Sequence, residues 1–257
     1  MRSVDICLSE WQTPPRNLSL PHHEAHVWMA LLDQPSAVKS TLLGALSPEE
    51  RARAHRFHAP RDRDRYVVAH GAMRDILGCY LGLAPADVRL DAAPNGKPVL
   101  APELRRYHLE FNLSHSHELA LIAVGSGRRV GIDVERIRSE VRGETIAEHF
   151  FSPPETALLR ALPPDARLAA FFAGWTRKEA YSKARGEGLR KPFDQFAVVI
   201  APDQPATLLY DGSDPRAPAH WSLRSLDVGS AYAAAVAVEG HDWRLRRWLW
   251  STPVCPR

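Results

Sequence analysis

The segment from Asp165 to Leu189 constrains the fold more strongly than any other part of the chain. Two prolines precede Asp165, which is a suitable N-cap residue, and the glycines at positions 186 and 188 are typical of a helix end. Within the segment the large apolar residues recur at helical spacing, as they do in a helix that packs one face against a core. The residues of this apolar stripe are Leu168, Phe171, Phe172 and Trp175. The sequence therefore predicts one long helix.

An acidic and a basic residue occupy the next two positions of the same helix face. Glu179 follows Trp175 by four residues, and Lys183 follows Glu179 by four, so both continue the apolar stripe. Buried charges are costly unless they are paired or bound to a metal ion. We interpret the two residues as part of a functional site. Spacing alone leaves open an exposed ion pair, worth a few tenths of a kcal/mol.

Composition places the chain among ordinary soluble proteins. Its 257 residues suffice for one large domain or two of average size, and 45% are hydrophobic and 25% charged. We find no apolar run of roughly 18 residues and no signal-peptide segment, so we expect no membrane association. The cysteines at positions 7, 79 and 255 are odd in number and far apart. They predict a reducing cytoplasm, with neither a disulfide framework nor a zinc site.

The order of predicted elements indicates an α+β fold. Each half of the chain combines a helical segment with several strands that look antiparallel, which predicts two comparable subdomains. We place an N-terminal extension at residues 1–22, one subdomain at 23–126 and a second at 127–257. The linker-like residues 125–127 separate the two subdomains.

Basic residues gather in one part of the N-terminal half. Six arginines fall between positions 51 and 65, although the net charge of the chain is only +3. Such a cluster favours an anionic partner: nucleic acid, a phosphorylated small molecule or an acidic protein. We interpret His22, His23 and His26 as solvated or structural residues, because no ligands follow them at zinc-like spacing.

Two carboxylates are predicted to share one face of a strand. Asp133 and Glu135 are two residues apart, while the apolar residues between and around them take the other face. At ~5 Å and an effective dielectric of ~20, each pair of like charges costs about 3 kcal/mol. Mg²⁺ removes such a cost, because it binds a few carboxylates together with substrate phosphates and water. Exposed carboxylates paired with nearby arginines are the alternative.

A possible anion site lies in the N-terminal half. Ser114 and His115 follow a predicted strand, and the arginine cluster lies upstream of them. Lys97, Arg53 and Arg65 are the cations we expect to contribute. A phosphate-rich substrate would use this basic site together with the acidic site of the other half.

These residues resemble the Sfp-type 4′-phosphopantetheinyl transferases, which move the phosphopantetheine arm of coenzyme A onto a serine of a carrier protein. Four blocks in the family's order carry the resemblance: residues 96–98 (Gly-Lys-Pro), 111–116 (Phe-Asn-Leu-Ser-His-Ser), 131–135 (Gly-Ile-Asp-Val-Glu) and 175–183 (Trp-Thr-Arg-Lys-Glu-Ala-Tyr-Ser-Lys). The similarity covers about residues 25–200 and implies a cytoplasmic monomer whose two subdomains are related by a pseudo-two-fold axis. The chain departs from the family at Glu50, where some members have a phosphate-binding basic residue.

The resemblance also implies residue roles. Mg²⁺ would be held by three carboxylates: Asp133, Glu135 and Glu179. Coenzyme A would be contacted by Arg53, Arg65, Lys97, Pro98, Ser114, His115 and Lys183, with His115 and the two arginines at the 3′-phosphate and Lys183 at the pyrophosphate. The catalytic residues would be Asp133, Glu179 and Lys183. The sequence leaves open whether Glu179 or Glu155 takes the proton of the incoming serine.

Two other functions remain open at this point. A Mg²⁺-dependent phosphohydrolase acting on nucleotides would use the same carboxylates. A nucleic-acid-binding module would use the arginine cluster, but the acidic residues oppose a phosphate backbone. We therefore expect coenzyme A and an acyl or peptidyl carrier protein as partners, and no nucleic acid.

Overall fold

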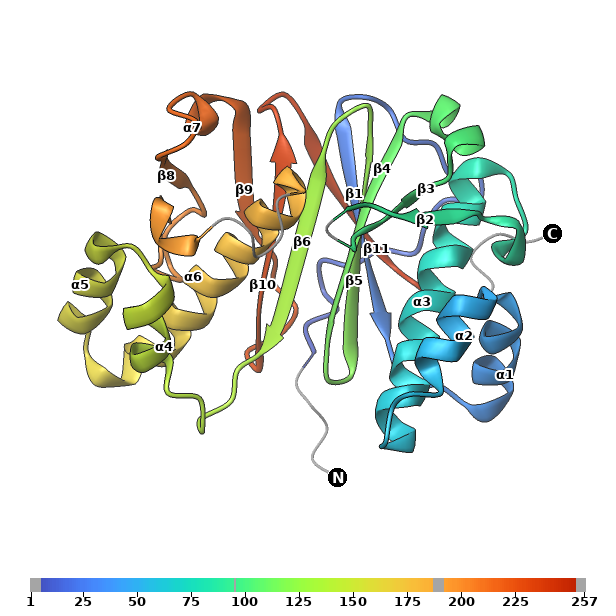
Figure 1. Ribbon diagram of the computed structural model, residues 1–257, viewed down its shortest axis with the longest axis horizontal. Coiled ribbons are helices and arrows are strands. Elements are labelled where there is room, and N and C mark those ends of the chain that lie inside the picture. Colours follow the sequence, from blue (N-terminus) through green and yellow to red (C-terminus); the bar gives the residue numbers. More distant parts are fainter. Residues whose placement is uncertain (1–5, 95, 187–191, 253–257) are drawn as a thin grey trace. The chain divides into compact units, whose positions relative to one another are not determined.

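The computed structural model describes residues 6–94, 96–186 and 192–252, which fall into two compact units. The N-terminal unit contains the chain from Trp11 to Gly127 together with the last strand, and the C-terminal unit contains Arg128 to Trp243 (Figure 1). Both units combine helices with mainly antiparallel strands, so the predicted α+β class with two subdomains is confirmed.

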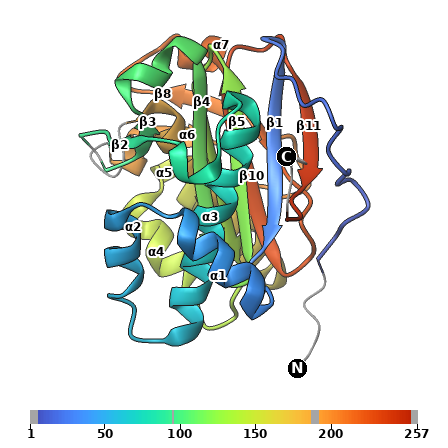
Figure 2. The same cartoon turned by 90° about the vertical axis from the view of Figure 1, so that its right-hand side faces the viewer.

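A four-stranded sheet forms the N-terminal unit, in the order β11-β1-β5-β4. Helix α3 packs on one face of this sheet, and α1 and α2 pack on α3 (Figure 2). The helices and strands of the unit are β1 (Glu24–Leu31), α1 (Ser36–Ala45), α2 (Pro48–Ala54), α3 (Pro60–Leu81), β2 (Leu90–Ala92), β3 (Pro98–Leu100), β4 (Leu109–Ser116), β5 (Leu119–Ser126) and β11 (Arg244–Leu249), with 3₁₀ turns at Pro85–Asp87 and Pro102–Tyr107.

Local sequence chemistry explains where α2 begins. The Ser47 hydroxyl accepts a hydrogen bond from the backbone of Glu50 at 3.2 Å, and the Glu50 carboxylate accepts one from the backbone of Ser47 at 2.9 Å. With Pro48 at the first helical position, these two hydrogen bonds form a capping box.

A three-stranded antiparallel sheet forms the centre of the C-terminal unit, in the order β6-β10-β9. The long helix α6 packs on β6 and β10 (Figure 1). The elements of the unit are β6 (Val130–Arg136), α4 (Gly143–Phe150), α5 (Pro153–Ala161), α6 (Pro164–Arg185), β7 (Phe196–Val198), β8 (Leu208–Asp211), α7 (Ala217–His220), β9 (Trp221–Ser225) and β10 (Tyr232–Glu239), with a 3₁₀ turn at Phe193–Gln195.

Helix α6 confirms most of the prediction for residues 165–189. Phe171 and Phe172 of the apolar stripe are buried, and Gly186 ends the helix with a φ of +72°. The predicted N-cap is wrong, because Pro163 takes the N-cap position and Asp165 lies inside the first turn. A proline fixes its own φ and pre-sets the helix start without a side-chain cap. The predicted end at Leu189 lies outside the described residues.

The last strand does not join the unit that the sequence predicts. Residues 244–249 were expected in the second subdomain, but β11 pairs in parallel with β1. Gln12 forms a bridge to Trp248, so this part of the expected extension lies on the same sheet edge. Pairing between segments more than 200 residues apart leaves no local pattern in the sequence. The boundary between the units, at Gly127 and Arg128, lies next to the expected one.

The cysteines also differ from expectation. Cys79 on α3 is disulfide-bonded, whereas Cys7 is free. The sequence predicts no disulfide framework and did not indicate this single disulfide, because spacing along the sequence does not tell which cysteines the fold brings together. The cysteine pattern consequently gives no support for a reducing compartment. In the described part of the chain, no helix has the length and apolarity needed to cross a membrane.

Gly131 permits the close packing of α6 on β6. A Cβ atom at this position would overlap the carbonyl oxygen of Ala180 and the backbone of Ala184. Gly131→Ala should therefore force the helix away from the strand and lower the free energy of unfolding by about 1–3 kcal/mol, measured by urea denaturation.

Gly44→Ala is the matched control, because an added Cβ in α1 meets nothing within 4 Å. It should raise stability by roughly 0.5–1 kcal/mol through helix propensity. A Gly131→Ala protein as stable as the parent would contradict the close-packing account.

Candidate active site

The contact between β6 and α6 brings charged side chains together. Asp133 and Glu135 leave the face of β6 that carries Gly131, which is the face under α6. The intervening Val130, Ile132 and Val134 are fully buried, as the alternating pattern predicts. The Asp133 side chain is only 3% exposed and that of Glu179 on α6 is 17% exposed. A carboxylate from the strand and one from the helix are therefore both largely removed from water.

Lys183 forms its shortest contact with the strand rather than with its helical neighbour. Its Nζ lies 2.5 Å from Oδ1 of Asp133 and 3.9 Å from Oε2 of Glu179. Burial alone would lower the pKa of Lys183, but Asp133 and Glu179 together raise it above its ordinary value. The exposed i,i+4 pair that spacing left open is thus replaced by a partly buried three-residue cluster.

The carboxyl group of Glu179 has a perturbed pKa. Burial raises its pKa to about 6; the Lys183 ammonium opposes this shift, while the carboxylates of Asp133 and Glu135 add to it. A carboxyl group with such a pKa is a better proton acceptor than an ordinary glutamate at neutral pH.

The described residues include no group of three or more His, Cys, Asp or Glu side chains already arranged around a metal position. Asp133 is instead paired with the Lys183 ammonium. The donor set nevertheless suits a hard divalent cation, because it consists of carboxylate oxygens that repel one another in a largely buried site. The chemistry of these residues therefore fits Mg²⁺, provided that Lys183 moves off Asp133.

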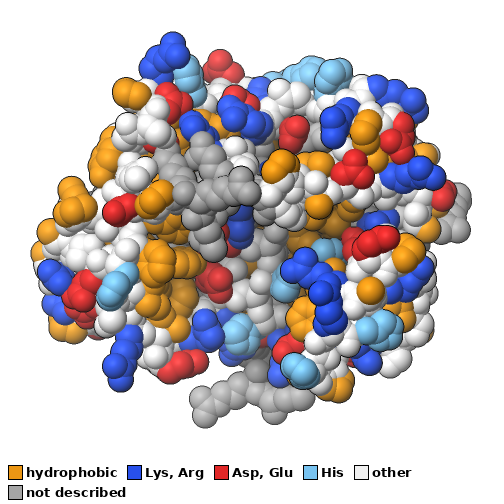
Figure 3. Space-filling model, viewed as in Figure 1, with side chains coloured by type: hydrophobic (Ala, Val, Ile, Leu, Met, Phe, Trp, Pro, Cys, Tyr) orange, Lys and Arg blue, Asp and Glu red, His pale blue; other side chains and the backbone are white. Residues whose placement is uncertain are grey.

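The expected phosphate-binding residues lie in the N-terminal unit. His115 is exposed and leaves the same face of β4 as Phe111, which packs in the apolar core under α3. Ser114 leaves the opposite face and is 8% exposed. Arg53 is exposed on α2, with its guanidinium 6.0 Å from the ring centre of Tyr66. On the face shown in Figure 3, Lys and Arg side chains gather over α3 and the adjoining end of α2.

Lys97 and Pro98 mark the start of β3, and both are partly exposed. Strand β3 pairs with β2 and packs near β4, which carries Ser114 and His115. Gly96, which comes just before Lys97, has a positive φ of 82°.

Arg65, which we expected to contact a phosphate, is paired with carboxylates in the structure. Its Nε and Nη2 donate to the two carboxylate oxygens of Asp33 at 2.7 and 2.8 Å, and Nη2 also lies 3.6 Å from Glu118. The side chain is only 7% exposed. A guanidinium held by two carboxylates in this way joins α3 to the ends of the sheet strands. This pairing argues against a phosphate contact by Arg65.

Glu50, where the resemblance implies a phosphate-binding basic residue in some family members, makes contacts within the N-terminal unit. Besides capping α2, its carboxylate accepts a 2.6 Å hydrogen bond from Arg74 and lies 3.3 Å from His70. These contacts and the capping hydrogen bond hold the pKa of Glu50 below its ordinary value despite burial. Glu50 is therefore part of the scaffold on which Arg53 is placed.

Glu155, the alternative proton acceptor, is fully engaged in structural contacts. Its Oε2 accepts from the backbone and hydroxyl of Ser152 at 2.8 and 2.7 Å, and its Oε1 accepts from the backbone of Val198 at 2.8 Å. The Lys178 ammonium lies 2.8 Å from Oε2, and both side chains are almost completely buried. The surroundings of Glu155 favour Glu179 as the proton acceptor. Sequence reasoning missed Lys178, although a second lysine beside Glu179 was a visible signal.

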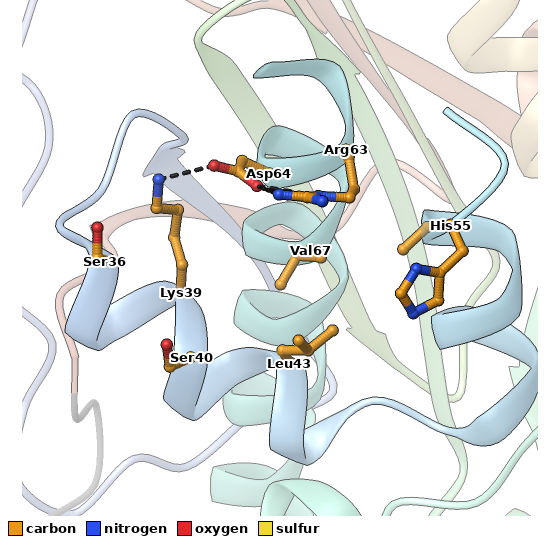
Figure 4. Close-up of a pocket in the computed structure, with 9 residues that line it drawn as sticks. Ser36, Lys39, Ser40, Leu43, His55, Arg63, Asp64 and Val67 are labelled. Carbon is orange, nitrogen blue, oxygen red and sulfur yellow. Dashed lines mark hydrogen bonds and ion pairs between the residues drawn. The ribbon is translucent and has the colours of Figure 1, made fainter. Parts of the chain in front are cut away.

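A separate pocket of about 320 Å³ lies between α1, α3 and the end of α2. Lys39 and Arg63 both bind the carboxylate of Asp64 there, at 2.7 and 3.1 Å (Figure 4). The other lining residues are Ser36, Ser40, Leu43, Ala54, His55 and Val67. None of the residues predicted for the active site lines this pocket.

Comparison with known proteins identifies the family. Residues 34–126 match the family described as "4′-phosphopantetheinyl transferase, N-terminal", and residues 129–237 match the "4′-phosphopantetheinyl transferase superfamily". The chain is 42% identical over 238 residues to the 4′-phosphopantetheinyl transferase HetI of Nostoc, covering 93% of this chain and 97% of that protein. The chain belongs to the 4′-phosphopantetheinyl transferase superfamily.

A more distant relative extends the comparison. A 4′-phosphopantetheinyl transferase of Bacillus subtilis is 30% identical over 220 residues, covering 84% of this chain and 93% of that protein. As a member of this superfamily, the present chain transfers phosphopantetheine from coenzyme A to carrier proteins. The phosphohydrolase and nucleic-acid alternatives are therefore set aside.

The perturbed pKa of Glu179 predicts that removing its charge stabilises the protein. Glu179→Gln keeps the shape of the side chain and relieves repulsion with Asp133 and Glu135. Without divalent cations at neutral pH, it should raise the free energy of unfolding by up to about 2 kcal/mol, measured by urea denaturation.

Asp165→Asn is the matched control, because it removes an exposed carboxylate from the first turn of the same helix. It should leave stability within about 0.5 kcal/mol of the parent, or slightly lower. A Glu179→Gln protein less stable than the parent would contradict the claim that burial and the neighbouring carboxylates destabilise charged Glu179.

Proposed function

We propose that Asp133, Glu135 and Glu179 hold Mg²⁺ together with the pyrophosphate of coenzyme A. The observation that carries this proposal is the largely buried cluster of Asp133, Glu179 and Lys183 where α6 lies closest to β6. Bound there, the cation would neutralise the carboxylates and withdraw charge from the pyrophosphate oxygens. Lys183 would then leave Asp133 and contact the pyrophosphate.

The remaining chemistry falls to two residues of α6. The serine oxygen of the carrier protein attacks the phosphorus that bears the pantetheine arm, and the bond from that phosphorus to the bridging oxygen breaks. Glu179 accepts the serine proton, for which its raised pKa suits it. The Lys183 ammonium stabilises the negative charge that develops on the departing adenosine 3′,5′-bisphosphate.

We assign the 3′-phosphate to His115 and Arg53, because both are exposed basic side chains of the N-terminal unit. Lys97 and Pro98 would lie along the adenine nucleotide, and Ser114 near the phosphates. Arg65 is left out of this set, because Asp33 and Glu118 surround its guanidinium.

The carrier protein we infer is an apo acyl or peptidyl carrier. Incubation of the enzyme with coenzyme A, Mg²⁺ and each apo carrier, followed by intact mass measurement, tests the assignment. The parent should add one phosphopantetheine to a serine of at least one carrier, while Glu179→Gln should show no turnover. Near-normal turnover by Glu179→Gln would remove it from the proposed site, whatever carrier is used.

The 3′-phosphate assignment predicts a substrate preference. Dephospho-coenzyme A should have a lower kcat/KM than coenzyme A, by roughly 10–150-fold for each charge-assisted hydrogen bond that the 3′-phosphate accepts. His115→Ala and Arg53→Ala should each lower kcat/KM for coenzyme A and leave that for dephospho-coenzyme A almost unchanged.

Arg89→Ala is the control, because this arginine belongs to the same unit and its side chain is 79% exposed. This substitution should leave kcat/KM almost unchanged for both coenzyme A and dephospho-coenzyme A. Equal kcat/KM values of the parent enzyme for both substrates would exclude a 3′-phosphate contact.

A further inference from the structure

Three consecutive residues of α6 point in different directions. Successive side chains on a helix are about 100° apart, so Arg177, Lys178 and Glu179 cannot share one face. Arg177 and Lys178 are 1% and 0% exposed, which is rare for charged residues. Glu179 faces the cluster on β6. The catalytic carboxylate is therefore preceded by two buried cations, and the direct role of Glu179 does not explain either of them.

Lys178 is held from several sides. Its ammonium donates to the carbonyl oxygens of Phe193 and Phe196, at 2.8 and 2.5 Å, and pairs with Glu155 at 2.8 Å. It also lies 4.3 Å from the ring centre of Phe196. These partners come from the 3₁₀ turn at 193–195, from β7 and from α5, so one side chain ties α6 to three elements.

Glu155 completes this connection. It accepts hydrogen bonds from Ser152, at the start of α5, and from the backbone of Val198 on β7. The pair Lys178–Glu155 thus fixes α6 against α5 and β7 in one orientation. On the neighbouring side of the helix, Arg177 donates to the carbonyl oxygens of Val199 and Ala201.

A need for stability alone does not explain a buried ion pair. Apolar side chains of similar volume often stabilise a core as well or better, because they carry no desolvation penalty. Directed hydrogen bonds do what apolar contacts cannot, which is to fix the rotation of a helix about its axis. For a carboxylate ~6 Å from the axis, a rotation of about 10° moves the group by about 1 Å. Displacements of that size can lower a catalytic rate by about 10²-fold.

We propose that Lys178 and Glu155 are positioning residues, which set the rotation of α6 so that the Glu179 carboxylate faces Asp133. This inference rests on the proposed function of Glu179. It gives Glu155 a part in catalysis without contact with the substrate. It also predicts that kcat per folded molecule falls when the pair is replaced.

The test is the double variant Lys178→Met with Glu155→Gln, which replaces the ion pair by uncharged side chains of similar size. Its melting temperature should fall, because the carbonyl groups of Phe193 and Phe196 lose their buried donor, so kcat is measured per folded molecule. Its kcat with coenzyme A and an apo carrier protein should fall by ~10–100-fold, while KM for coenzyme A changes little. In the absence of substrate, its affinity for Mn²⁺, measured by electron paramagnetic resonance, should fall because the three carboxylates no longer converge.

Tyr181→Phe is the matched control on the same helix. It removes the buried hydrogen bond from the Tyr181 hydroxyl to Asp211, 2.7 Å long. It should lower the melting temperature and leave both kcat per folded molecule and Mn²⁺ affinity unchanged. This variant shows the effect of lowered stability alone, because the Lys178–Glu155 pair that positions Glu179 stays intact.

An unchanged kcat and Mn²⁺ affinity in the double variant would show that the pair is only structural and would overturn the proposal. If the double variant does not fold, Glu155→Gln alone decides, because it keeps the contacts of Lys178 with the carbonyl groups. Its melting temperature should fall, because the buried Lys178 ammonium loses its counter-charge. Its kcat per folded molecule should fall as well, and a parental kcat per folded molecule would overturn the proposal. Turnover by Glu179→Gln would instead mark a failure of the proposed function itself.

Discussion

The close contact between α6 and β6 at Gly131 is the constraint on which the active site depends. Because this residue has no side chain, the backbone of α6 at Ala180 and Ala184 can lie directly on the strand. Asp133, two residues further along β6, then comes within reach of Lys183, and near Glu179. A glycine on the strand thus determines the distances among charged residues far apart in the sequence.

This packing places carboxylates that repel one another in a largely buried site, and the Lys183 ammonium offsets part of the repulsion. Burial and the neighbouring carboxylates of Asp133 and Glu135 together raise the pKa of Glu179 to about 6. Lys183 balances part of the negative charge. A site of this kind is stabilised by a divalent cation and by a phosphate that Lys183 can bind, which suits pyrophosphate chemistry. Such sites sacrifice some stability of the free enzyme for function.

Local patterns predicted much of the fold and the core of the site, and long-range contacts account for the rest. The capping box at Ser47, the buried stripe of α6 and the alternation along β6 all depend on neighbouring residues, so the sequence shows them directly. The parallel pairing of β11 with β1 and the binding of Arg65 by Asp33 join distant segments. No spacing rule reports such contacts, so the pairing of Arg65 with Asp33 could not be predicted from the sequence.

The most direct test of the account is a crystal structure of the enzyme with coenzyme A and Mn²⁺, in which anomalous scattering locates the metal. We expect one metal peak coordinated by Asp133, Glu135 and Glu179, with Lys183 displaced from Asp133 to the pyrophosphate. A metal bound elsewhere, with Lys183 still paired to Asp133, would contradict it.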